Sequence, residues 1–291
     1  MSSRRSPSAS PGEEVASSRA RGIALYALFP LVACGQLWAA LELAGLRLTP
    51  TVAFGLEGLA ILVAIILALR RPPENAELGR WWAIGGGMFL VWAVLYFAAA
   101  RVTEPMHART FDDAILARLP LKPEFAAIYL GVHVFGVIPF CVLPETRLLR
   151  RHLLGAVLIV LLSAIAWVAL PVRLDRPTVP VEAVGFGAWL LRGIHSVDPT
   201  TNCFPSAHCA IAVYAAIGLR FGRSRMLFIW GIATATMICI STVMTRQHYV
   251  ADVASGAVLA ALAAYGTQRK SRALRKVSET PERPGGGNPT P

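Results

Sequence analysis

The sequence predicts an all-α protein, a polytopic membrane helix bundle of about eight transmembrane helices. Three observations lead to this prediction. The chain of 291 residues is 55% hydrophobic and only 15% charged, which is more apolar than a soluble domain of this length usually is. Apolar runs of roughly 18 or more residues recur along it, each long enough to cross a bilayer as a helix. Basic residues are distributed unevenly between the segments that separate these runs, as they are in membrane proteins.

The expected membrane helices lie, in order, near residues 22–44, 51–69, 82–100, 124–144, 153–171, 205–219, 226–244 and 250–266. Those at 205–219 and 250–266 are the least regular, because they are short and begin on polar residues. The first run is too long for a signal-peptide core, so we interpret it as a retained helix. The flanking segments 1–21 and 267–291 are rich in Ser, Arg, Pro and Gly, and we expect both to be disordered tails.

The distribution of Lys and Arg predicts the orientation of the bundle. With both termini in the cytoplasm, the inner segments are 1–21, 70–81, 145–152, 220–225 and 267–291, and they hold 19 of the 28 basic residues. Cytoplasmic loops carry such an excess, so the net charge of +11 reports topology and attraction to anionic lipid. Scattered basic residues without a reading motif argue against nucleic-acid binding. Richness in Ala and Arg favours a bacterial cytoplasmic membrane as the location.

Two short polar motifs stand at the ends of apolar runs. Residues 204–208 read Phe-Pro-Ser-Ala-His, and residues 241–252 read Ser-Thr-Val-Met-Thr-Arg-Gln-His-Tyr-Val-Ala-Asp. Ionisable groups at membrane depth are costly and therefore mark candidate functional sites. In the expected topology both motifs reach the extracytoplasmic face together with the loop 172–204. The sequence thus predicts one active site on that face.

The residue types in the two motifs suit phosphoryl transfer through a histidine. His248 and Asp252 are four residues apart, which places them on one face of a helix. A carboxylate beside an imidazole fixes its tautomer and stabilises the cation that forms during reaction. A histidine held in this way is a nucleophile for phosphorus. His208, from the other motif, is the candidate general acid for the leaving oxygen.

Four further residues are candidates for holding the phosphate. Ser206 follows a proline at a predicted helix N-terminus, where backbone N–H groups and the helix dipole favour an anion. Arg173, Arg176 and Arg246 are extracytoplasmic cations in or near the motif segments, and arginine binds phosphate through a bidentate fork. The sequence contains no acidic Mg²⁺-binding cluster and no Gly-rich phosphate loop. We therefore expect metal-independent chemistry without a cofactor.

Other functions remain open at this point. Two histidines and an aspartate have the ligand types of a zinc site. Glu57, inside the second expected span, is either packed against a polar neighbour or the ion site of a transporter or flippase. A non-catalytic membrane scaffold is a third class. His133 and His195 lack acidic neighbours at helical spacing, and we expect them to be structural.

Two extracytoplasmic segments carry apolar residues at helical spacing. They are 105–120, which also holds a pair of aspartates, and 186–194. Each is expected to be an interfacial helix, a loop packed on the bundle, or a lid that guides a lipid into the site. Of the five cysteines, four lie in apolar runs as small core residues, whereas Cys203 adjoins the first motif as a candidate free thiol.

The two motifs together resemble a known family. Pro-Ser-x-His over 205–208, followed by a Ser, six residues, His, three residues and Asp over 241–252, resembles the type 2 phosphatidic acid phosphatase superfamily. The resemblance covers about 82–266 and implies a six-helix phosphatase-like core, to which 22–70 adds two helices. In that family the second histidine is the nucleophile, the aspartate supports it and the first histidine is the acid. These roles would fall on His248, Asp252 and His208.

Departures from the family pattern indicate a branch. Arg176-Pro177 matches the end of the family's first motif, but Ala169 stands where a lysine is usual. Ala207 replaces a glycine, and Thr242 replaces an arginine. With these changes the motifs look more like those of the inositol phosphorylceramide synthases, which implies transfer of a phosphoinositol head group.

The expected function is therefore that of an integral membrane enzyme acting on a membrane lipid phosphate ester through a phosphohistidine intermediate. An alcohol acceptor such as inositol would make it a phosphotransferase, toward which the branch resemblance leans. Water as the acceptor would make it a lipid phosphate monoester phosphatase. The two reactions share their first half, so the motifs do not separate them.

Overall fold

A computed structural model describes residues 32, 35–46, 49, 52 and 76–278, apart from 105, 144, 145 and 223. In this part of the chain the regular structure is helical and contains no strand, which confirms the all-α prediction. Isolated bridges pair Val172 with Arg109 and with Asn202. The expected tail 1–21, Glu57 and nearly all of the expected helix 51–69 lie outside the described residues.

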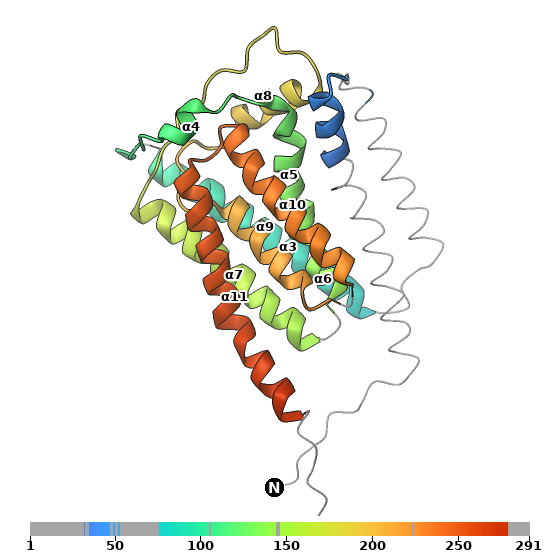
Figure 1. Ribbon diagram of the computed structural model, residues 1–291. Coiled ribbons are helices and arrows are strands. Elements are labelled where there is room, and N and C mark those ends of the chain that lie inside the picture. The colour runs from blue at the N-terminus through green and yellow to red at the C-terminus, as the bar shows by residue number, and fades with distance from the viewer. Residues whose placement is uncertain are drawn as a thin grey trace, which may run out of the picture.

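The described helices form a bundle with its longer loops at one end (Figure 1). In chain order they are α3 (Ala76–Thr103), α4 (Ala114–Arg118), the 3-10 turn η1 (Pro123–Phe125), α5 (Ala126–Phe135), α6 (Ile138–Val142), α7 (Thr146–Ala169), α8 (Phe186–Val197), α9 (Ala207–Leu219), α10 (Arg225–Met244) and α11 (Val250–Ser278). Residues 35–43, before α3, are also helical. Helices α4 and α8 lie at the loop-rich end, together with the start of α11 (Figure 1).

Three of the described helices are long and apolar enough to cross a membrane, namely Arg147–Ala169, Arg225–Met244 and Val250–Thr267. Three apolar helices are shorter, at Val91–Thr103, Pro123–Phe135 and Ala207–Leu219. The long helices expose large apolar side chains, among them Ile165, Ile229 and Leu262. Such surfaces fit contact with lipid and an integral membrane protein. The described residues do not reach the expected count of eight spans.

Two expected boundaries differ in the structure. The expected span 124–144 is divided into α5 and α6, since the chain turns at Gly136 and Val137. The reason is Pro139, which has no N–H to continue the helical ladder and is tolerated only in the first turn of α6. At the other end, α11 runs to Ser278 and so extends into the segment 267–291, for which the sequence predicted a disordered tail.

Helix α9 lies at the centre of the bundle and packs against α10, α11, α7, α6 and α5. Its buried side chains are mostly small, including Ala210, Ala212 and Ala215, and small residues let apolar helices approach closely. Gly256 of α11 has the same role, because a Cβ there would collide with the carbonyl oxygen of Ser206. This close approach brings the start of α11 beside the start of α9, where the two polar motifs lie.

The two expected interfacial segments take different forms. Helix α8 covers the predicted 186–194 and buries Phe186 and Ile194, while Trp189 remains exposed. Its first N–H groups have no side-chain cap from α8 itself; instead the Glu42 carboxylate accepts from Phe186 N at 2.8 Å and Gly187 N at 3.0 Å. The segment 105–120 contains only the five residues of α4 as a helix.

Candidate active site

The first motif is held at the N-terminus of α9. Ser206 is the N-cap, and its hydroxyl oxygen accepts from Cys209 N at 3.3 Å. Its own N–H donates to the carbonyl of Asp252 at 3.1 Å, and the Trp167 indole donates to the carbonyl of Pro205 at 3.1 Å. A hydroxyl that accepts a capping bond still has its proton to donate. Ser206 is fully buried at the junction of the two motifs.

The second motif is shaped by the end of α10. Thr245 is the C-cap, and Arg246 follows with φ of 56°, in the left-handed region that glycine usually occupies at this position. The chain then reverses, and His248 N donates to the carbonyl of Thr242 at 3.2 Å. This turn places His248 two residues before Val250, where α11 begins. Asp252 follows in the first turn of α11.

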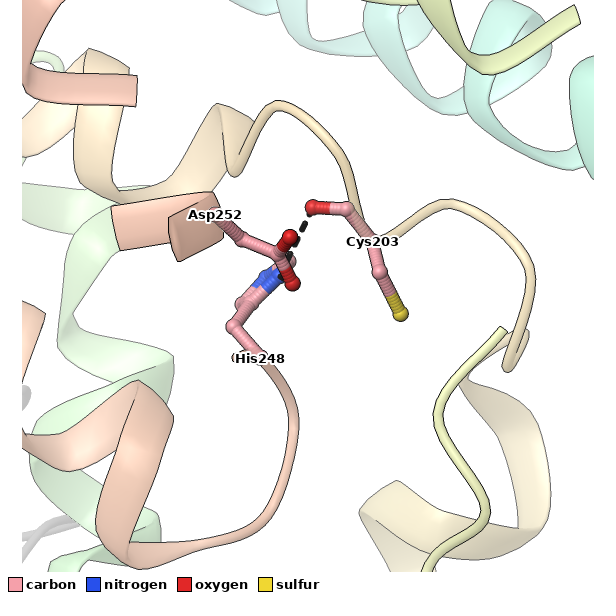
Figure 2. A group of neighbouring side chains, drawn as sticks. All are labelled: Cys203, His248 and Asp252. Atoms are coloured by element: carbon pink, nitrogen blue, oxygen red, sulfur yellow. Dashed lines mark hydrogen bonds and ion pairs between the residues drawn. The ribbon is translucent and has the colours of Figure 1, made fainter. Parts of the chain in front are cut away.

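His248 and Asp252 face each other, as their spacing predicted. His248 Nδ1 lies 3.5 Å from Asp252 Oδ2 and 3.0 Å from the carbonyl oxygen of Cys203. Figure 2 shows that carbonyl, rather than the sulfur, turned toward the ring. Because both neighbours are acceptors, Nδ1 carries the proton and Nε2 holds the free lone pair. The same Asp252 oxygen accepts from Tyr249 N at 2.8 Å, which fixes the carboxylate.

Burial and the Asp252 carboxylate act in opposite directions on the pKa of His248. Burial disfavours its protonated form, but the hydrogen bond and the negative charge of Asp252 outweigh this effect and raise the pKa of His248 above its ordinary value. The site therefore stabilises an imidazolium at this position. Formation of a bond between Nε2 and phosphorus would create such a cation.

His208 faces the same space from α9. Its ring centroid lies 5.7 Å from that of His248, and the side chain is buried. Four other rings surround it, with centroids 4.6, 5.8, 6.0 and 6.4 Å away for Tyr129, His133, Trp92 and Tyr96 respectively. The two imidazoles are therefore neighbours in the fold. The two histidines thus suit attack and protonation on opposite sides of one phosphorus.

The three candidate arginines all bind carbonyl oxygens of loops at this end of the bundle. Arg176 donates to the carbonyls of Asp198 and Pro199 at 2.7 and 2.9 Å, and Arg173 donates to that of Glu104 at 3.1 Å. Arg246 donates to the carbonyls of Leu116, at 2.6 Å, and Leu119. In each of the three the Nε–H is buried and lacks a partner among the described residues. The Nε–H of each guanidinium is thus available to an anion.

Sequence reasoning missed several residues around the two histidines. His133 was expected to be only structural, yet it lies next to His208, and Tyr129 lies closer still. Their spacing of four residues on one apolar helix was the available signal. Asp113 was also missed: it caps α4 through Oδ1 and accepts from Val250 N at 2.8 Å through Oδ2, which ties α4 to the start of α11.

His195, the other histidine expected to be structural, donates from Nε2 to the carbonyl of Thr245 at 3.0 Å. It thereby joins α8 to the end of α10. Burial lowers the pKa of His195, so the neutral ring is favoured. This placement agrees with a structural role.

A metal site was the alternative for the same residues. Among the described residues, the group with suitable spacing is Cys203, His248 and Asp252, whose ligand atoms lie within 4.8 Å of one another. Two features fit poorly. His248 Nδ1 carries a proton toward Asp252 and a carbonyl, whereas a metal ligand must be deprotonated. Burial raises the pKa of the Cys203 thiol, which donates to the carbonyl of Thr200 at 3.2 Å.

Comparison with known proteins bears on the same part of the chain. A search of curated proteins and a search of solved structures each found no match. A family model described as the PAP2 superfamily matches residues 152–275, a segment that contains α9, α10 and the two motifs. Over this segment, which is less than half of the chain, the protein is similar to the PAP2 superfamily, whose members are phosphatases or phosphotransferases.

Proposed function

We propose that this protein is a membrane enzyme that transfers the phosphoryl group of a lipid phosphate ester through a phosphohistidine on His248. The observation that supports this most directly is the geometry of its ring. Nδ1 is fixed by Asp252 and by the Cys203 carbonyl, which leaves the Nε2 lone pair available, and the ring of a second buried histidine, His208, lies 5.7 Å away between centroids. This is the arrangement that an oriented nucleophile and a general acid require.

The reaction has two halves. In the first, the Nε2 lone pair of His248 attacks phosphorus, the bond between phosphorus and the leaving oxygen breaks, and His208 gives its proton to that oxygen. Asp252 stabilises the positive ring that results. In the second half, His208 takes a proton from the acceptor hydroxyl, whose oxygen attacks phosphorus and displaces Nε2. Proton and phosphoryl group are then both accounted for.

Charge on the phosphoryl oxygens is stabilised by donors that the fold leaves available. Ser206 can donate its hydroxyl proton while it caps α9, and Arg173, Arg176 and Arg246 each keep a buried Nε–H. Since phosphoryl transfer depends on positioning and on electrostatic stabilisation, fixed guanidinium groups are effective there. No step requires a metal ion, and we propose metal-independent turnover.

A small apolar cavity next to His208 supports an apolar leaving alcohol. It measures about 90 Å³ and reaches His208, Trp92 and His133 at its polar side. The rest of its lining comes from α5, the turn between α5 and α6, and helices α6, α7 and α9, namely Val132, Gly136, Val137, Phe140, Ala156, Val160 and Ile211. Because His208 protonates the leaving oxygen, a hydrocarbon chain attached to that oxygen starts on this side. A lipid alcohol meets this requirement, whereas a free sugar phosphate does not.

The acceptor and the orientation complete the proposal. The motif pattern supports an alcohol acceptor such as inositol, and water is the alternative. The excess of Lys and Arg on the segments away from the motifs supports an active site on the extracytoplasmic face.

The test is phosphorus transfer from a panel of lipid phosphates in detergent, with and without EDTA and with and without inositol or glycerol. Free phosphate identifies a phosphatase, and a new phosphate ester of the added alcohol, formed only in its presence, identifies a transferase. His248→Ala should abolish both products, while His107→Ala, an exposed histidine in the same loop region, should not. Full turnover by His248→Ala would exclude the mechanism, and loss of wild-type activity in EDTA would exclude metal independence.

A further inference from the structure

Asp198 lies at the centre of a network that neither motif contains. Its Oδ2 accepts from the Tyr129 hydroxyl at 2.8 Å, and its Oδ1 accepts from the Tyr96 hydroxyl. The same carboxylate forms an ion pair with Arg176, Nη2 to Oδ2, at 3.5 Å, and the two side chains are only 15% and 6% exposed. The carboxylate therefore joins α3, α5 and the loop after α7 at a single point.

Both tyrosines bind Asp198 through their hydroxyls and contact His208, the proposed general acid, through their rings. The Tyr129 ring lies 4.6 Å from the ring of His208 at an interplanar angle of 31°, and the Tyr96 ring meets His208 edge-on at 6.4 Å. Tyr96 also packs edge-on against Trp167, whose indole holds the carbonyl of Pro205 in the first motif. Two walls of the His208 pocket are thus fixed at their far ends by one carboxylate.

An aspartate at position 198 is not explained by a contribution to the stability of α8. Asp198 is the C-cap of α8, where the negative end of the helix dipole disfavours a carboxylate. A buried ion pair is in general weak evidence of a stabilising role, because desolvation opposes the attraction. The contacts of Asp198 are instead directed at Arg176 and at the surroundings of His208.

We propose that Asp198 is a positioning residue, which sets Arg176 and the two tyrosines so that the phosphoryl group and the proton of His208 align. This inference rests on the proposed function. Asp198 does not touch the reacting atoms in the proposal, and it acts through its three partners. Small displacements of groups that position a reaction lower its rate strongly, so its loss should affect kcat more than KM.

The test compares Asp198→Asn with Asp175→Asn, an exposed aspartate in the loop beside Arg176. Both are measured for kcat, KM and thermal unfolding in detergent with a lipid phosphate that the wild type turns over. We expect Asp198→Asn to lower kcat by about tenfold or more, which corresponds to about 1.4 kcal/mol of transition-state stabilisation, with KM nearly unchanged. Asp175→Asn should match the wild type.

A second variant keeps the test valid if Asp198→Asn folds poorly. Tyr129→Phe retains the ring beside His208 and removes only the hydroxyl that Asp198 accepts from. It should lower kcat in the same direction, and the double variant should be no worse than Asp198→Asn alone, because the two residues act as one unit. Unchanged kcat in both single variants, or a rise in KM alone, would overturn the inference. An active wild type with an inactive His248→Ala would still leave the proposed function standing.

Discussion

Replacing Asp252 by Asn tests the charge that the site places behind the nucleophile. Asp252 is fully buried, and its Oδ2 lies 3.5 Å from His248 Nδ1. Two unit charges at that distance attract by about 5 kcal/mol at an effective dielectric constant of about 20. Since the attacking ring is neutral and becomes cationic as it bonds to phosphorus, this stabilisation is lost from the transition state, and kcat should fall by roughly 10³-fold or more. The asparagine oxygen can still accept from Tyr249 N, so folding should be preserved.

The assay is a single-turnover measurement of phosphate release over a range of pH, with unfolding followed in parallel. In the wild type, activity should rise as His248 loses its proton, at a pH above the ordinary histidine value of about 6.5. In Asp252→Asn the carboxylate that raises the pKa of His248 is gone, while the burial that lowers it remains. The rise of activity with pH should therefore occur at lower pH in the variant. The stability contributed by protonated His248 is complete below about pH 6.5 and is lost as pH rises through the raised pKa. The variant should lack this dependence.

Two results would refute this reasoning. One is an Asp252→Asn enzyme that keeps wild-type kcat, since the charge would then be irrelevant to the reaction. The other is a rising limb that moves to higher pH, since the carboxylate would then not be the group that favours the protonated ring.

Two further substitutions test the packing around the site. Gly256→Ala should lower the unfolding temperature and the activity, because its Cβ collides with a backbone oxygen and overpacking costs about 1–3 kcal/mol. Gly266→Ala is the control, because this glycine faces open space on the same helix and its replacement should be tolerated. Equal effects of the two substitutions would contradict the steric argument. Arg246→Gly should keep the fold, since glycine suits the φ of 56°, yet lower turnover at least about tenfold through loss of the guanidinium. Full activity of Arg246→Gly in the same phosphate-release assay would remove Arg246 from the site.

The parts of the structure that depend on local spacing could be predicted from the sequence. His248 and Asp252 are four positions apart, which predicted that they would lie close together, and their side chains are 3.5 Å apart although His248 precedes α11. Apolar runs likewise located α7, α10 and α11, because a helix that satisfies its own backbone is the simplest structure for such a run. The break in 124–144 could also have been predicted, because Pro139 restricts the backbone whatever the hydropathy of the run.

The parts that depend on tertiary contact could not be predicted. Tyr96, Tyr129, Arg176 and Asp198 come from four separate segments, and no spacing in the sequence relates them. The arginines illustrate the same difficulty. Their charge indicated phosphate binding, but the backbone carbonyl oxygens that they also bind became apparent only in three dimensions.

The Glu42 carboxylate links the N-terminal segment to α8 and, through α8, to the candidate active site. By capping α8 it fixes one end of a twelve-residue helix whose other end is Asp198. A shift of α8 along its axis would move Asp198, and with it Arg176 and the tyrosines beside His208. In the proposed mechanism the helix at 35–43 would therefore support the active site from a distance, and we expect its removal to lower turnover although none of its residues approaches the phosphate.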